Sequence, residues 1–172
     1  MPMLSWNEVR DNAIAFSRSW SDATRERADA QTFWNEFFAI FGRDRRTVAS
    51  FEVAVCNIQG QYNFINLYWS GMLLVEHARS ADDFSGAESR AVQYIADLVR
   101  EEPDTQAPRY IMLTDFQRIV LFDLEPGENA DPASFAGHRY TMICFPLSDL
   151  RWFIRHFAFI KREQTVRQLP IR

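Results

Sequence analysis

Two runs of sequence decide the fold, Tyr62-Asn-Phe-Ile-Asn-Leu-Tyr-Trp69 and Met72-Leu-Leu-Val-Glu-His77, and Ser70-Gly71 joins them. Their aromatic and branched aliphatic residues favour a β-hairpin. Neither run alternates cleanly between apolar and polar residues, which predicts central strands covered on both faces by helices. Asn66 and Glu76 interrupt this apolar setting. A buried amide or carboxylate is costly unless it is paired, so both are candidate site residues.

The turn of this hairpin decides whether Asn66 and Glu76 share one face of the sheet. Side chains alternate along a strand, so the two share a face only if paired residue numbers have an even sum. A two-residue loop separates them. A three-residue loop over residues 69–71 pairs Tyr68 with Met72 and brings them together, and the glycine at its last position suits a left-handed backbone. We therefore predict the three-residue loop.

Length and composition indicate one domain with an aromatic core, and the order of helices and strands along the chain predicts the α/β class. The chain has 172 residues, of which 15 are Phe and 5 are Trp, and its net charge is −4. A strong autonomous DNA binder is normally basic, so any DNA contact by this domain should be weak and local. No signal peptide or long apolar run indicates export or a membrane span. Cys56 and Cys144 lack metal-site spacing and are expected to be free, buried thiols in a reducing cytoplasm.

The flanking elements follow from apolar periodicity and turn residues. Ser5 and Glu8 form a capping box at the start of the first helix. The other expectations are helices over 5–20, 30–41, 47–57, 86–102 and 148–159, strands over 109–114 and 118–124, an edge strand over 139–145, a linker over 22–29, a surface loop over 125–137 and a basic tail over 161–172. Asp115 is expected to form the turn between the paired strands.

Some polar residues allow two interpretations. Arg43, Arg45 and Arg46 are either a solvated turn or a DNA-binding patch that contacts phosphate with help from the N-terminus of the next helix. Glu52, on the predicted helix 47–57, is either a site acid that points toward the sheet or a rim carboxylate. His77 follows Glu76 and therefore faces the opposite side, where a buried, hydrogen-bonded histidine is favoured over a metal ligand.

The hairpin resembles the segment "FIDLFWPGVLLVEQKS" near the N-terminus of MmeI-like type IIG restriction–modification proteins. Residues 64–69, Gly71 and residues 73–76 match it nearly in register. The segment 108–124, "PRYIMLTDFQRIVLFDL", is also similar to the family, and Ala91 and Tyr94 match its "QAxxY" helix signature. The resemblance spans roughly residues 30–160 and is densest at residues 49–79 and 107–124.

The resemblance implies a restriction-endonuclease-like mixed sheet flanked by helices, within residues 1–160, and a tail over 161–172 that leads to a helical spacer. In this family one chain carries a nuclease of the PD-(D/E)xK superfamily and an adenine-specific DNA methyltransferase, which together suggest phage defence. The resemblance also implies that an active nuclease would use Mg²⁺ or Mn²⁺, and that S-adenosylmethionine would bind only to the methyltransferase. The methyltransferase signatures are absent from this sequence. The implied partners are DNA and the rest of the polypeptide.

The catalytic positions depart from the family pattern. Asn66 stands where the family has Asp, Ala78 where it has Lys, and Arg90 where it has Gln. Divalent ions in nuclease sites require charged oxygens, so a metal site at Glu76 and Asn66 should be weak or lost. We expect Arg90 to neutralise Glu76 in place of a metal, with Tyr94 one helical turn away. Glu76, Asn66, Glu52, Arg90 and Tyr94 form the predicted degenerate site.

Three functions remain open from the sequence. The first is a catalytically degenerate endonuclease-like domain of a restriction–modification protein. The second is an active metal nuclease with a rearranged site that uses Glu52, Glu76 and Arg79. The third is an unrelated protein-interaction module. Clustering of Glu52, Asn66, Glu76 and Arg90 favours the first two.

Overall fold

A six-stranded mixed sheet forms the centre of the domain. The computed structural model describes residues 3–21, 29–125 and 140–161. The strands lie in sequence order across the sheet, and only β3 and β4 run parallel. Their bounds are β1 Ser50–Cys56, β2 Tyr62–Trp69, β3 Leu73–His77, β4 Tyr110–Thr114, β5 Arg118–Asp123 and β6 Thr141–Pro146.

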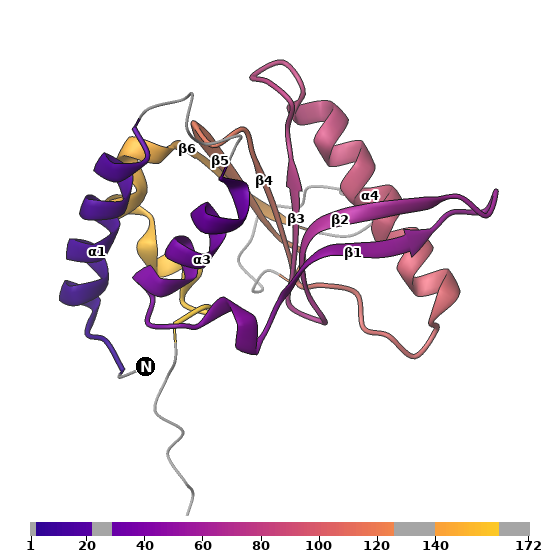
Figure 1. The fold of residues 1–172 in the computed structure, drawn as a ribbon, viewed down its shortest axis with the longest axis horizontal. Helices are drawn as coiled ribbons and strands as arrows, with labels where there is room; N and C mark the ends of the chain where they lie inside the picture. The colour runs from indigo at the N-terminus through magenta and orange to yellow at the C-terminus, as the bar shows by residue number, and fades with distance from the viewer. Residues whose placement is uncertain (1–2, 22–28, 126–139, 162–172) are drawn as a thin grey trace, which may run out of the picture.

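Helices cover both faces of the sheet (Figure 1). One face carries α1 (Trp6–Ser19), α3 (Ala30–Ile40) and the 3₁₀ turns η2 (Leu147–Trp152) and η3 (Ile154–Phe157). The other face carries α4 (Phe84–Glu101), which packs on β1, β3 and β4. Parallel strands need a crossover, and α4 supplies the one between β3 and β4. This confirms the α/β class and the mixed, helix-flanked sheet expected of a restriction-endonuclease-like fold.

The larger core is built from aromatic rings beneath α1 and α3. Phe33, Trp34 and Phe37 of α3 are fully buried. The Phe33 ring meets Trp34 edge to face at a centroid distance of 5.0 Å, and Phe37 meets Phe157 of η3 at 5.3 Å. Such pairs add about 0.5–1.5 kcal/mol each beyond the burial of their area. This core anchors α3 against the sheet beside β3.

The first two helices begin and end as predicted. Ser5 and Glu8 form both hydrogen bonds of the capping box at α1. Gly42 follows α3 with φ +75°, a left-handed backbone that glycine adopts without steric cost. The strands over 110–114 and 118–123 are confirmed as well, and Asp115 Oδ1 accepts hydrogen bonds from the backbone N–H groups of Gln117 and Arg118 in the turn between them.

The predicted helix over 47–57 is wrong, because this segment is strand β1 preceded by the 3₁₀ turn η1 (Arg45–Thr47). Burial alternates here, with Glu52 and Ala54 exposed and Val55 buried. Two β-branched valines at a spacing of two suit a pleated strand. Glu52 has φ +51°, which no helix interior allows.

The predicted final helix is also wrong, since residues 147–157 form two 3₁₀ segments. The buried residues there are mostly three apart, which matches the three residues per turn of a 3₁₀ helix. They are Leu147, Leu150, Ile154, Phe157 and Ile160. The buried residues therefore follow the 3₁₀ period rather than the α-helical period of the prediction.

The hairpin loop is three residues long but lies one residue later than predicted. Trp69 pairs with Leu73, and Tyr68 pairs with Leu74 rather than with Met72. The numbers of paired residues still have an even sum, as the prediction required. Gly71 adopts φ +72° inside the loop. The pairing of Tyr68 with Met72 fails because Met72 belongs to the turn, where its N–H bonds the Trp69 carbonyl at 2.9 Å.

The remaining expectations concern the cysteines, the edge of the sheet, the connecting segments and membrane spans. Both cysteines are free, but Cys56 is only partly buried and Cys144 is exposed, so the expectation of buried thiols is wrong. The edge strand is confirmed as β6, at the end of the sheet. The linker over 22–29, the loop over 125–137 and the tail over 161–172 lie almost entirely outside the described residues. Within the described part of the chain, no helix has the length and apolarity needed to cross a membrane.

The aromatic core makes a direct stability prediction. Replacing Phe37, which is fully buried, with Ala should lower the free energy of unfolding by about 3–5 kcal/mol, because it leaves a cavity among rings. Phe64→Ala is the matched control, since 53% of Phe64 is exposed, and should cost under about 1 kcal/mol. Urea unfolding followed by tryptophan fluorescence measures both. Equal losses would contradict the assignment of α3 to the main core.

Candidate functional site

Glu76 lies in the most buried strand of the sheet. Leu73, Leu74 and Val75 of β3 are fully buried, and Glu76 itself is only 6% exposed. It pairs with Leu113 of the parallel neighbour β4, and its side chain faces α4. A carboxylate in such a position requires a compensating charge or a proton, because an isolated buried charge is strongly unfavourable.

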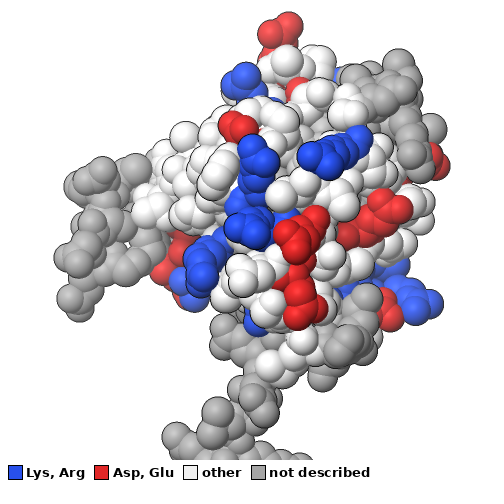
Figure 2. Space-filling view, turned by 90° about the vertical axis from the view of Figure 1, so that its left-hand side faces the viewer, with Lys and Arg blue, Asp and Glu red and all other residues white. Residues whose placement is uncertain are grey.

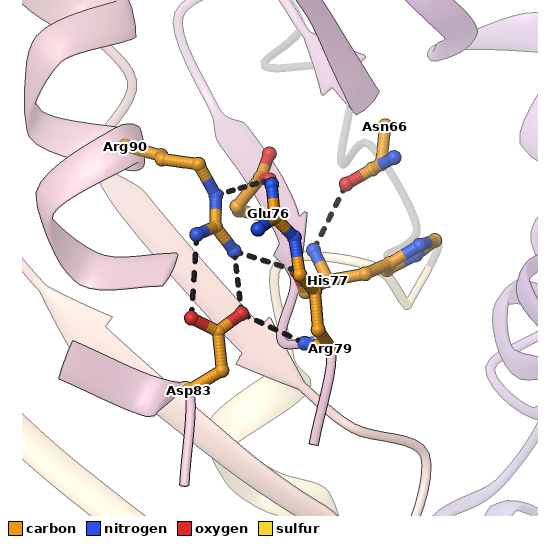
Figure 3. Close-up of polar contacts among 6 residues, drawn as sticks. All are labelled: Asn66, Glu76, His77, Arg79, Asp83 and Arg90. Carbon is orange, nitrogen blue, oxygen red and sulfur yellow. Dashed lines mark hydrogen bonds and ion pairs between the residues drawn. The ribbon is translucent and has the colours of Figure 1, made fainter. Parts of the chain in front are cut away.

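Arg90 of α4 supplies that charge (Figure 3). Its Nε lies 3.1 Å from Glu76 Oε1, and one terminal nitrogen donates to the His77 carbonyl oxygen at 3.2 Å. The Arg90 side chain is 25% exposed, so the ion pair sits at the edge of the buried region. The structure thus brings together Glu76 and Arg90 as predicted from the sequence.

Asp83 completes this group and was missed from the sequence. It accepts from both terminal nitrogens of Arg90, at 2.9 and 3.4 Å, and its Oδ2 also accepts from the Arg79 backbone N–H. Seven residues separate Asp83 from Arg90, which is two helical turns, so they lie on one face of α4. That spacing was the available signal, but Asp83 lies outside the predicted helix, which begins at residue 86.

Gly86 makes room for the pair of Asp83 and Arg90. A Cβ atom at position 86 would lie 2.3 Å from Asp83 Oδ1 and 3.2 Å from an Arg90 terminal nitrogen. Any larger residue must therefore displace the Asp83 carboxylate. The glycine in the first turn of α4 is explained by this close approach.

Asn66 sits where two strand ladders are interrupted. The β1–β2 pairing skips Glu52 and Asn66, and the β2–β3 pairing ends at Leu67 and Val75. Ile65 packs with the core beneath α4, whereas Leu67 packs with the opposite core, so the alternation changes phase at Asn66. In Figure 1 the hairpin of β1 and β2 extends away from the other strands.

The Asn66 side chain does not bond to Glu76. Its Oδ1 instead accepts the backbone N–H of His77 at 2.9 Å, as Figure 3 shows. The two residues lie on adjacent strands, yet Asn66 satisfies a backbone donor left by the interrupted ladder. A cation at Glu76 would therefore have to compete with this backbone donor for Asn66 Oδ1.

Burial and ion pairing shift the pKa values of Glu76 and Asp83 in opposite directions. Burial raises the pKa of Glu76 to about 7, against the hydrogen bond and charge of Arg90. The hydrogen bond from Arg90 lowers the pKa of Asp83 to about 2. Asp83 is therefore the permanent anion of the group, whereas Glu76 exchanges its proton near neutral pH.

His77 faces the other core, as predicted. Trp34 Nε1 donates to His77 Nε2 at 2.9 Å, and the Phe116 ring lies 4.8 Å from the imidazole. Burial lowers the pKa of His77 to about 4, so its ring is neutral at pH 7. Its Nε2 accepts a hydrogen bond and is not available as a metal ligand, which confirms the interpretation of a buried, bonded histidine.

The remaining predicted site residues lie around Glu76. Tyr94 is buried on α4, and burial together with the Glu76 charge raises its pKa. Glu52 is exposed on β1, and its charge is among those that raise the pKa of Glu76. Arg79 follows the end of β3, and its charge acts on Asp83 and Tyr94. It therefore lies on the α4 side, not on the opposite face that regular alternation predicts.

The residues at this site do not fit a divalent cation. Within residues 3–21, 29–125 and 140–161, no three His, Cys, Asp or Glu side chains gather where they could hold a metal ion. Glu76 Oε1 is taken by Arg90 and Asn66 Oδ1 by a backbone N–H, which leaves Glu76 Oε2 as a buried oxygen with no partner. Mg²⁺ needs several oxygen ligands at short distances, and this arrangement offers one.

Comparison with known proteins gives one family. The family model described as "MmeI, N-terminal domain" matches residues 11–170. The chain belongs to this family. It is thus the N-terminal domain of a restriction–modification enzyme, in agreement with the resemblance of the hairpin. No curated protein and no solved structure matched the chain.

In this MmeI N-terminal domain, the three arginines predicted to bind DNA stabilise the segment between α3 and β1. Arg43 donates to the Ile160 carbonyl, Arg45 donates to Asn35 and to the Ala49 carbonyl, and Arg46 pairs with Asp44 at 3.0 Å. The helix N-terminus expected to assist them is absent, because β1 follows. DNA binding at this turn stays a prediction.

A pocket beside Ala78 was not foreseen from the sequence. It has a volume of 270 Å³ and is lined by Ala30, His77, Ala78, Arg79 and Phe116. Ala78 is the position at which MmeI-like proteins carry the lysine. Ala78 itself is buried with residues of α4.

The shifted pKa of Glu76 predicts a pH-dependent stability. Its native pKa of about 7 exceeds the ordinary value of 4.5, so the native state holds this proton more tightly than the unfolded state. The contribution is complete below pH 4.5 and is lost as pH rises through 7. Glu76→Gln should remove this decline, a relative gain on the order of 1–3 kcal/mol at pH 8.

Urea unfolding of wild type and Glu76→Gln between pH 4.5 and 8 measures the difference. Asp104→Asn, a change at an exposed loop carboxylate, is the control and should follow wild type. A difference between wild type and Glu76→Gln that does not vary with pH would show that Glu76 keeps an ordinary pKa in the native domain.

Replacing Gly86 with Ala should change the pKa of the neighbouring Asp83. The new Cβ must displace Asp83 Oδ1, which weakens the hydrogen bonds from Arg90, so the pKa of Asp83 should rise from about 2 toward 3.8. Carboxyl ¹³C NMR titration of Asp83 measures this shift, and Ser85→Ala at the exposed neighbour is the control. An unchanged Asp83 titration in Gly86→Ala would contradict the close approach.

Proposed function

We propose that this domain is an endonuclease-like module whose metal-dependent cleavage has been lost. The protein that contains it would carry an adenine-specific DNA methyltransferase in another part of the chain, which alone would use S-adenosylmethionine. The domain would then serve as a scaffold, a weak DNA contact or a regulator of that methyltransferase. The observation that carries the proposal is the Arg90 guanidinium 3.1 Å from Glu76.

Phosphodiester hydrolysis by a metal nuclease needs an ion to activate water and to neutralise the developing phosphate charge. In the PD-(D/E)xK pattern an Asp and a Glu hold that ion, and a Lys assists. Here Asn66 carries no charge, Ala78 carries no amine, and Arg90 already provides the positive charge beside Glu76. With a pKa of about 7, Glu76 is also partly protonated at neutral pH, which further weakens any affinity for a cation.

An active nuclease with a rearranged site is the second candidate. Two observations favour it: the Glu52 charge raises the pKa of Glu76, and Arg79 lies on the α4 side. In this version Glu52 and Glu76 would hold Mg²⁺ or Mn²⁺, and Arg79 would replace the missing lysine. It requires Arg90 to release Glu76, whereas Arg90 is held in place by Asp83 and the His77 carbonyl.

Calorimetric titration with Mn²⁺ separates these functions. Wild type should bind no ion. Asn66→Asp with Ala78→Lys restores the family pattern, and adding Arg90→Gln removes the competing cation, so the triple variant should bind Mn²⁺ more tightly than the double. Adding Glu76→Ala to the triple variant is the matched control and should abolish binding.

Two results would overturn the proposal. Mn²⁺ binding by wild type that is lost in Glu76→Ala would show a working rearranged site. Absence of binding in every variant, with folding retained by circular dichroism, would show that this region was not built as a nuclease metal site.

A further inference from the structure

A pocket with two arginines lies between α1 and η2, on the side of the sheet opposite to Glu76. It has a volume of 280 Å³, several times the roughly 30 Å³ share of one water molecule. It is lined by Arg18 and Arg151, by the serines Ser17, Ser21 and Ser148, and by Ile14. The two arginines each carry several N–H donors, whereas the hydroxyl groups of Ser17 and Ser21 already donate to backbone carbonyl oxygens.

The pocket is fixed by contacts between α1 and η2. Ser17 Oγ lies 3.0 Å from the Leu147 carbonyl oxygen, which ties the last turn of α1 to the start of η2. This bond sets Arg18, the next residue, beside Ser148. Beneath it the buried residues Ala13 and Leu150 belong to the same core. The arrangement therefore rests on packed elements rather than on a loop.

The two arginines have no acidic partner in the described part of the chain. No described carboxylate lies within ion-pairing distance of Arg18 or Arg151, although acidic residues outnumber basic ones in the whole protein. The Cζ of Arg151 lies 4.9 Å above the ring of Trp152, which orients this guanidinium without neutralising it. Two like charges lining one pocket repel, and an anion between them would relieve that repulsion.

We propose that this pocket binds a phosphate group through Arg18 and Arg151. A planar guanidinium binds phosphate oxygens with two parallel hydrogen bonds. The phosphate has two possible sources, the backbone of a nucleic acid or a free phosphate. The nucleic-acid source rests on the proposed function, because a restriction–modification enzyme works on DNA, whereas phosphate binding itself rests on the pocket alone.

A second basic group on the same side favours the nucleic-acid source. Arg155 Cζ and Lys161 Nζ lie 4.7 and 5.4 Å from the ring of Trp6, at the opposite end of α1 from Arg18. Twelve residues separate Trp6 from Arg18, about 18 Å at the rise of an α-helix. Figure 2 looks onto this side of the molecule and shows several basic side chains close together near its centre, with acidic ones beside them. A polyanion can reach both groups, whereas a free phosphate fills only one.

Binding of a 20-base-pair duplex, measured by fluorescence anisotropy at several salt concentrations, tests the nucleic-acid source. Arg18→Gln with Arg151→Gln should weaken binding at least tenfold at low salt and reduce the slope of log K against log salt by about 1 to 2. The matched control is Arg100→Gln with Arg109→Gln. It removes the same charge from two arginines that are paired with Asp97 and Asp123. Arg18 and Arg151 are exposed, so thermal unfolding should be nearly unchanged.

Titration of wild type with inorganic phosphate, followed by ¹⁵N NMR of the arginine Nε groups, tests the free-phosphate source. Selective shifts of Arg18 and Arg151 support the pocket, and they assign it to free phosphate if duplex binding is the same in all variants. Equal loss of duplex binding in both double variants, without selective phosphate shifts, overturns the proposal. So does the absence of both effects. The Mn²⁺ titration at Glu76 is independent of all these outcomes.

Discussion

The constraint on which this structure depends is a carboxylate buried in the central strand of a sheet. Glu76 has apolar neighbours along β3 and a leucine opposite it on β4, so its charge has little solvent. Arg90 comes from the helix that crosses between these strands, and Asp83 holds Arg90 in place. The group carries one cation between two carboxyl groups, and the raised pKa of Glu76 shows that burial outweighs the attraction of Arg90.

This ion pair also accounts for the local architecture of α4. Asp83 precedes the helix, Gly86 leaves space in its first turn, and Arg90 follows two turns after Asp83. The helix is therefore attached to β3 by charge at its beginning and by apolar contacts through Ala87, Ala91 and Tyr94. A charge network at the rim with an apolar stripe behind it limits the cost of desolvating the charges.

The two faces of the sheet differ in chemistry. The α4 side contains the buried ionisable group, whereas the α1 side contains an aromatic core with an arginine-lined pocket on its surface. Adjacent residues of β3 separate these environments, because Glu76 faces the ion pair and His77 faces Trp34 and Phe116. Asn66 lies where the paired strands β1 and β2 diverge from the rest of the sheet, and its amide oxygen accepts the backbone N–H of His77 in place of a strand partner.

The sequence by itself determined the α/β class, the hairpin, most helices and strands, and the meeting of Glu76 with Arg90, because apolar periodicity and capping residues act locally and the family pattern fixed the positions of this pair. The segment around Glu52 was misassigned as a helix. Alternating valines in a short apolar run fit the helical period as well as the strand period until a partner strand is known. Only the tertiary structure decided that Asn66 bonds a backbone N–H and that Asp83 completes the ion pair. Ladder interruptions and contacts across a pocket depend on long-range packing, which no local pattern encodes.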